Sequence, residues 1–66
     1  MKNFVIIDMI SNKPVTSVLA RNEKSALNKY KRGLTSTGFY EIHKERSDWV
    51  LSTSYGAYFK AIIPHN

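Results

Sequence analysis

The sequence has no cysteine, only 5 acidic side chains, and only 3 glycines and 2 prolines among its 66 residues. Without cysteine the chain can form neither a disulfide framework nor a thiolate zinc site, on which secreted domains of this size usually depend. Its N-terminal apolar run, residues 4–7, is shorter than the roughly 7 to 15 residues of a secretory signal, and no run approaches the roughly 20 that span a bilayer. These absences lead us to expect a cytoplasmic protein that does not enter a membrane.

The sequence also has no motif of catalysis. No G-x-S-x-G pattern frames a serine, and Gly33, Gly38 and Gly56 are too far apart to cradle a phosphate. A chain of this length buries only roughly 60% of the surface that it exposes when unfolded, which leaves little room for a deep, water-excluded active site. We expect one domain over residues 1–66, with no enzymatic activity, no cofactor and no small-molecule substrate.

Five short runs rich in apolar and β-branched residues predict strands. The hydrophobic fraction of 42% is ordinary for a globular chain and argues against disorder. Turn-forming residues at 11–14 and 45–48 separate the first two and the next two of these runs, as in β-hairpins. The predicted strands cover residues 4–9, 15–20, 39–44, 49–53 and 57–63.

A helix is predicted between the second and third strands. Asn22 can cap its first turn, and Leu27, Tyr30 and Leu34 recur at the spacing of one helix face. Gly33 suits the left-handed conformation that often ends a helix. The resulting order, ββαβββ, predicts the α+β class: a single small domain in which one amphipathic helix packs on one face of an antiparallel sheet.

Such a sheet has apolar side chains on both faces, because Phe4 and Ile7 point to opposite sides of the first strand. We expect Leu27 and Tyr30 of the helix to pack with Ile7 and Ile42. A helix of roughly 12 residues is about 18 Å long and covers only part of one face. A second copy of the chain in a homodimer, another protein or stacked nucleobases would then cover the second face.

Positive charge is concentrated in one part of the chain. Residues 13–32 contain six basic side chains and one acid, Glu23, so this segment alone carries the formal net charge of +5 of the whole chain. We expect the basic residues of the helix to spread over the side opposite to its apolar stripe. A plain alternative is a solvated helix face, since amphipathic helices generally carry Lys and Arg outward. The candidate binding residues for nucleic acid or an acidic protein surface are Lys13, Arg21, Lys24, Lys29, Lys31 and Arg32.

Aromatic residues are concentrated in the second half of the chain, which holds six of the eight. Aromatic side chains that face away from the helix can stack on single-stranded bases, or can form a dimer or partner interface, where Tyr and Trp are equally common. The interface is the role we favour. The candidate partner-facing aromatic residues are Tyr40, Trp49 and Tyr58.

Glu41, His43 and Glu45 alternate along one predicted strand, so their side chains share a face, as the ligands of a metal ion must. A single strand seldom supplies a complete metal site, and charged residues on the solvent side of a strand show the same spacing. We therefore predict no metal ion at these residues.

In its size, its ββαβββ order and its basic helix, the chain resembles several small phage-encoded inhibitors of bacterial defence systems, including some anti-CRISPR proteins. This resemblance implies a stoichiometric inhibitor and assigns no role to any residue. From the residues, the preferred interpretation is a small basic, non-enzymatic binding module for nucleic acid or for a protein complex that handles it. The alternative is a protein-binding inhibitor or adaptor that docks through its aromatic sheet face, and a purely structural homo-oligomer is a third interpretation.

Overall fold

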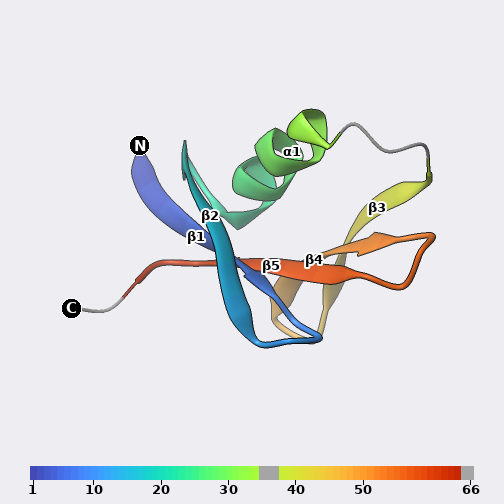
Figure 1. Cartoon of the computed structure of the whole chain (residues 1–66). Coiled ribbons are helices and arrows are strands. Elements are labelled where there is room, and N and C mark those ends of the chain that lie inside the picture. The colour runs from blue at the N-terminus through green and yellow to red at the C-terminus, as the bar shows by residue number, and fades with distance from the viewer. Residues whose placement is uncertain (35–37, 65–66) are drawn as a thin grey trace.

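A computed structural model describes residues 1–34 and 38–64, which form a five-stranded sheet with a helix on one of its faces (Figure 1). The predicted α+β class and element order are confirmed. The helix has 11 residues against the roughly 20 that span a bilayer, so no helix in the described residues could cross a membrane. The elements are β1 (Lys2–Asp8), β2 (Lys13–Ala20), α1 (Glu23–Gly33), β3 (Tyr40–Glu45), β4 (Asp48–Thr53) and β5 (Tyr58–Ile62).

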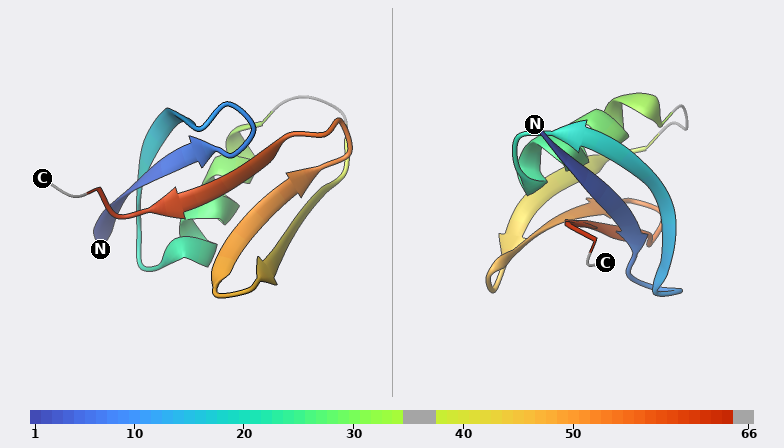
Figure 2. Two further views of the ribbon diagram at one scale, coloured as in Figure 1. Left: turned by 90° about the horizontal axis from the view of Figure 1, so that it is seen from below. Right: turned by 90° about the vertical axis from the view of Figure 1, so that its left-hand side faces the viewer.

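The sheet order is β2-β1-β5-β4-β3, and every neighbouring pair is antiparallel. Two hairpins, β1–β2 and β3–β4, therefore lie on either side of β5. Figure 2 shows the turns of these hairpins on opposite sides of β5, both directed away from α1. We call the side of the sheet that α1 covers the helix face and the opposite side the open face.

The turn between β1 and β2 is built around Asp8 and Asn12. The Asp8 carboxylate accepts hydrogen bonds from the backbone N–H of Ile10, at 2.9 Å, and of Ser11, at 3.3 Å. Asn12 has a left-handed conformation with φ of 59°, which asparagine tolerates better than most residues. Pro14, predicted as a turn residue, is instead the second residue of β2, where proline is tolerated because β2 is an edge strand.

Helix α1 begins where the sequence predicts. The Asn22 side chain accepts a hydrogen bond from the Ser25 N–H at 2.9 Å and so caps the first turn. The prediction of a left-handed Gly33 is wrong, because Gly33 is the last helical residue and its φ is not positive. The chain leaves the helix at Leu34 with φ of −81° and ψ of 125°. The extended conformation of Leu34 ends the helix, so a left-handed residue is not needed at this position.

The core lies between α1 and the helix face. Phe4 from β1, Leu27 from α1 and Leu51 from β4 are at most 1% exposed. The Tyr30 ring packs edge-on against Phe59 with the ring centroids 5.0 Å apart. Burial raises the pKa of Tyr30 above its ordinary value of 10.0, because the ionised form is poorly solvated there.

The expected contacts of the helix with the sheet are confirmed in part. Ile42 packs at the margin of the core, as predicted. Ile7 does not: it lies on the open face, and its neighbour Ile6 packs under the helix instead. Residues 4–7 are all apolar, so the alternation of the strand could not decide which pair faces the helix.

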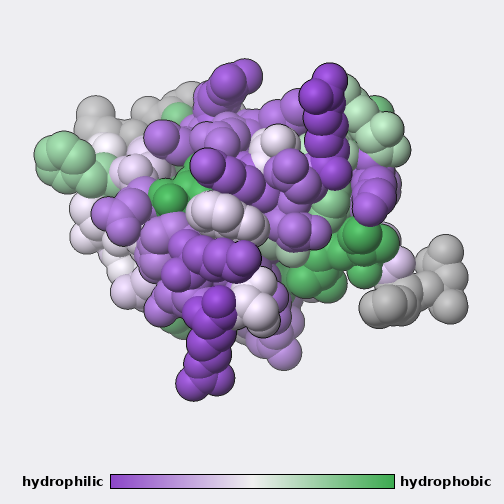
Figure 3. Space-filling model, turned by 180° about the vertical axis from the view of Figure 1, so that it is seen from behind, coloured by the Kyte–Doolittle hydropathy of each residue, from purple (hydrophilic) through white to green (hydrophobic). Residues whose placement is uncertain are grey.

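Part of the open face is covered by the chain itself. Val50 on β4 is 1% exposed and Ile7 is 9% exposed, although α1 lies on the other side of the sheet. Met9 and Arg46, one from each hairpin turn, line a shallow depression together with Val50. Seen from behind, a view that keeps α1 at the top and does not look onto the open face, the surface is mainly hydrophilic, with a hydrophobic patch at its right-hand side (Figure 3). The large apolar residues of the open face that stay exposed are Leu19, Tyr58 and Ile62.

Candidate nucleic-acid interface

Five of the six predicted basic residues lie on α1 or directly before it, and the sixth, Lys13, lies elsewhere. Lys13 begins β2 and pairs with Asp8, whereas Ala20, the last residue of β2, adjoins α1. Seven steps of strand at about 3.3 Å each separate Lys13 from Ala20 by about 23 Å. The basic surface is therefore formed by α1 and the preceding Arg21, without Lys13.

The side of α1 that faces away from the sheet carries hydrogen-bonding side chains. Asn28 donates from its amide nitrogen to the Lys24 carbonyl oxygen at 3.2 Å. Ser25 and Asn28 are half-buried and lie on the side of the helix away from the apolar stripe of Leu27, Tyr30 and Leu34. A shallow depression on this side is lined by four residues from successive turns of the helix, namely Ser25, Asn28, Lys29 and Arg32.

One flank of α1, toward β4, combines lysine with tryptophan. The Nζ atoms of Lys24 and Lys44 lie 5.0 Å and 6.0 Å from the centroid of the Trp49 ring, where each cation is attracted to the aromatic face. Lys31 follows Lys24 by seven residues and so lies on the same flank, within about 20° around the helix axis. The expectation that these two lysines lie opposite to the apolar stripe is therefore wrong, because they are only about 40 to 60° away from Leu27. Lys44 is not among the residues that the sequence singles out. The contact between Lys44 and Trp49 could have been predicted from the hairpin, because each residue lies directly outside the predicted 45–48 turn. Residues in these positions pair across the two strands, as Lys44 and Trp49 do.

The other flank of α1 adjoins the end of β2. Lys29 Nζ donates a hydrogen bond to the Leu19 carbonyl oxygen there. An ammonium group has three donors, so two remain for a ligand. Because β2 is an edge strand, an unpaired backbone carbonyl there could accept a hydrogen bond from a strand of another molecule. The hydrogen bond from Lys29 occupies this carbonyl oxygen. Lys24 and Lys29 are thus held on opposite flanks of one helix.

In the described part of the chain, no carboxylate forms an ion pair with a lysine or an arginine; the ion pairs found there are those of His43. Glu23, the only acid of α1, is half-buried in the first turn. It lines a depression beside the start of β4, together with Asp48 and Trp49. The outer side of α1 therefore presents cations that no carboxylate of the described residues pairs with.

The three predicted partner-facing aromatic residues do not share a surface. Tyr40 and Trp49 lie on the helix face, where both pack against the core. The Tyr40 ring meets Tyr55 edge to face, with centroids 6.3 Å apart. Of the three, only Tyr58 lies on the open face, where it is 40% exposed. The structure therefore does not bring these residues together into an aromatic sheet face.

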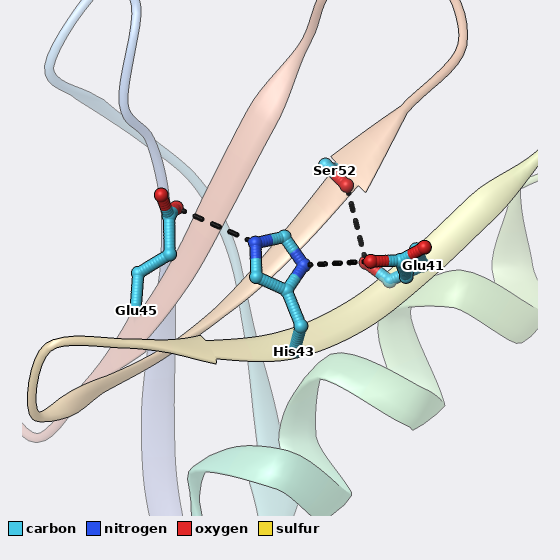
Figure 4. Close-up of polar contacts among 4 residues, drawn as sticks. All are labelled: Glu41, His43, Glu45 and Ser52. Atoms are coloured by element: carbon cyan, nitrogen blue, oxygen red, sulfur yellow. Dashed lines mark hydrogen bonds and ion pairs between the residues drawn. The ribbon is translucent and has the colours of Figure 1, made fainter.

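Glu41, His43 and Glu45 share the open face, as their spacing predicts (Figure 4). His43 Nδ1 lies 3.4 Å from Glu41 Oε1, and His43 Nε2 lies 3.5 Å from Glu45 Oε2. The Ser52 hydroxyl donates to the Glu41 carbonyl oxygen at 3.5 Å. Because the two ring nitrogens face different carboxylates, the three side chains do not converge on one point. Within residues 1–34 and 38–64, no group of His, Cys, Asp or Glu is arranged to hold a metal ion.

Comparisons of the chain with protein families, with curated proteins and with solved structures give no match. Its function must therefore be inferred from its own surface. We define the α1 surface as the exposed and half-exposed polar residues of the helix that face away from the core, namely Lys24, Ser25, Asn28, Lys29, Lys31 and Arg32.

The α1 surface has the chemistry of a polyanion-binding site. Lysine binds phosphate oxygens as a point charge, and the planar arginine side chain can donate two parallel hydrogen bonds to them. Serine and asparagine add neutral donors and acceptors. The charge pattern of the sequence does not point to Ser25 and Asn28, because both are neutral. Helical spacing does predict that both side chains face away from the sheet. Together these groups can hold a phosphate backbone and also contact uncharged groups beside it.

Proposed function

We propose that this chain is a small basic, non-enzymatic binding module that associates with nucleic acid through the α1 surface. One observation carries the proposal: four cations lie on the exposed sides of one 11-residue helix, and none has an ion-pair partner among the described residues. Cations that neutralise phosphates release the counterions condensed on nucleic acid, and this release supplies most of the non-specific affinity. The four cations are Lys24, Lys29, Lys31 and Arg32.

The fixed positions of two lysines favour binding over a merely solvated helix face. Lys24 lies over Trp49 and Lys29 is hydrogen-bonded to the Leu19 carbonyl, so both long side chains are already partly ordered. Ordering such a side chain at an interface costs roughly 0.5 to 1.5 kcal/mol. The free protein has already lost part of the conformational entropy of Lys24 and Lys29, so binding of phosphates by these two lysines loses less of it.

The alternative, a stoichiometric protein-binding inhibitor that uses an aromatic sheet face, has less support. Tyr40 and Trp49 lie on the helix face and pack against the core, which leaves Tyr58 with the apolar Leu19 and Ile62 on the open face. A protein bound to the open face would leave α1 free. Substitutions in the α1 surface therefore distinguish the two functions.

A fluorescence-anisotropy titration with labelled single- and double-stranded oligonucleotides, at about 150 mM salt, tests the proposal. The α1 triple variant replaces Lys24, Lys31 and Arg32 together by Gln. We expect the wild type to bind and the α1 triple variant to lose most of its affinity. Its fold should remain intact, because all three side chains are exposed; circular dichroism checks this.

A matched control removes the same number of positive charges at a distance from α1. The control triple variant replaces Lys13, Arg46 and Lys60 by Gln; these residues lie at the far end of β2, in the β3–β4 turn and on the open face. We expect it to bind nearly as well as the wild type. The proposal is refuted if the wild type binds neither oligonucleotide, or if both triple variants bind equally well.

A further inference from the structure

The outermost line of α1 carries neutral hydrogen-bonding groups and one arginine. Ser25, Asn28 and Arg32 fall within about 60° of one another on the side away from the sheet, at 3.6 residues per turn. Asn28 uses one amide hydrogen on the Lys24 carbonyl, which leaves its amide oxygen and its second hydrogen available. In the major groove of DNA, asparagine pairs with the edge of adenine and arginine with the edge of guanine.

The lysines of α1 lie to either side of this line. Lys24 and Lys31 are about 70 to 90° away from it on one flank, and Lys29 is about 70° away on the other. Their contacts agree with these directions, because Lys24 reaches Trp49 on β4 whereas Lys29 reaches Leu19 on β2. The helix thus presents a polar ridge with two lysines on one flank and one lysine on the other.

This arrangement matches the major groove of B-form DNA. A helix with its side chains is about 10 to 12 Å across, and the groove is about 12 Å wide. A helix in the groove directs its outermost side chains to the base edges and its flanking side chains to the phosphates of the two walls. Figure 1 shows α1 above the sheet, with the C-terminal end of the helix at the top of the molecule. Arg32 belongs to this last turn.

Single strands and duplex RNA fit the structure less well. Single-stranded nucleic acid is generally held by several exposed aromatic rings on one surface. Here Lys24 and Lys44 lie over Trp49, and Tyr58 is on the opposite face. The most exposed rings, Phe39 and Tyr55, lie just before β3 and in the turn between β4 and β5, and not on the α1 surface. The major groove of duplex RNA is too deep and narrow for side chains to reach the bases.

We infer that the α1 surface binds duplex DNA by lying in its major groove. Asn28 and Arg32 meet the base edges, while Lys24, Lys29 and Lys31 meet phosphates on the two walls. This inference rests on the proposed function and adds to it the class of nucleic acid and the groove.

The decisive titration compares labelled duplex DNA, single-stranded DNA and duplex RNA of one sequence and length at the same salt concentration. We expect duplex DNA to bind at least about tenfold more tightly than either of the others, because of the three only duplex DNA has a major groove that admits the helix. Equal or tighter binding of single-stranded DNA or duplex RNA overturns the inference and leaves the proposed function standing. If the wild type binds none of the three, both fail.

Two single variants then test the roles of the ridge and of the flanks, on a duplex selected by the wild type from a random-sequence pool. Asn28→Ala should weaken binding about tenfold without changing the slope of log affinity against log salt, whereas Lys31→Gln should flatten that slope by about 0.9. Asn3→Ala, a matched substitution on β1, should change neither quantity. The inference is overturned if Asn28→Ala binds the selected duplex as tightly as the wild type.

Discussion

The Leu27→Ala substitution removes the side chain that packs α1 most deeply onto the sheet. Leu27 is 0% exposed and belongs to one cluster with Phe4, Leu51 and Phe59. Truncating a fully buried leucine costs about 2 to 5 kcal/mol, because transfer free energy is lost and a cavity remains. At roughly 0.05 to 0.15 kcal/mol per residue, the 66-residue chain has about 3 to 10 kcal/mol of total stability. We expect the variant to lose a large part of its stability and to be partly unfolded at 25 °C.

Urea unfolding followed by circular dichroism measures this loss as a lower midpoint at an unchanged m-value. Lys31→Ala is the matched control on the same helix, since Lys31 is exposed and its truncation should change stability by no more than about 0.5 kcal/mol. A loss below about 0.5 kcal/mol for Leu27→Ala as well would refute the packing of α1 described above.

Three further predictions concern the helix cap, the partly buried Tyr30 and self-association. Asn22→Ala should lower stability by about 1 kcal/mol in the urea assay, because the first turn loses its cap; an unchanged midpoint would contradict the cap. Burial favours the neutral form of Tyr30, so its raised pKa predicts stability that is complete below about pH 10 and falls as the pH rises beyond it. Thermal melts should show a smaller alkaline loss for Tyr30→Phe than for the wild type. The exposed apolar residues Leu19, Tyr58 and Ile62 predict self-association at high concentration, and light scattering that shows only the 7.6 kDa chain would argue against it.

The order of the elements was predictable because turn-forming residues bound each strand and Asn22 marks the start of the helix. The choice of the buried face was not. Residues 4–7 are apolar throughout, and the face is decided by pairing of β1 with β5, a contact between the two ends of the chain that no local pattern reveals. The conformation of Gly33 was missed for a related reason. The helix ends at an extended Leu34, and no local pattern in the sequence marks this residue as the one that leaves the helix.

The concentration of basic residues on α1 was predictable from the sequence, but Lys24 and Lys31 lie on the flank toward β4 and not opposite to the apolar stripe. The positions of the aromatic residues required strand pairing. Partners in the β3–β4 hairpin share a face, so Tyr40 and Trp49 lie on the same side as Ile42 and Leu51. Because Leu51 is buried against the helix, both aromatic residues belong to the helix face. The sequence composition does not show that Tyr40 and Trp49 pack inside the molecule, which is why both were predicted to face a partner. Lys44 was missed because it lies outside the basic segment and reaches Trp49 only through this pairing.

The salt dependence of binding tests the central claim, that phosphates bind to the α1 surface, most directly. Each phosphate contact contributes about 0.9 to the slope of log affinity against log salt for duplex DNA and about 0.7 for a single strand. The slope of the α1 triple variant should therefore be flatter than that of the wild type by about 2 to 3, while the control triple variant keeps the wild-type slope. Identical slopes for all three proteins, or no binding by the wild type, would contradict the claim.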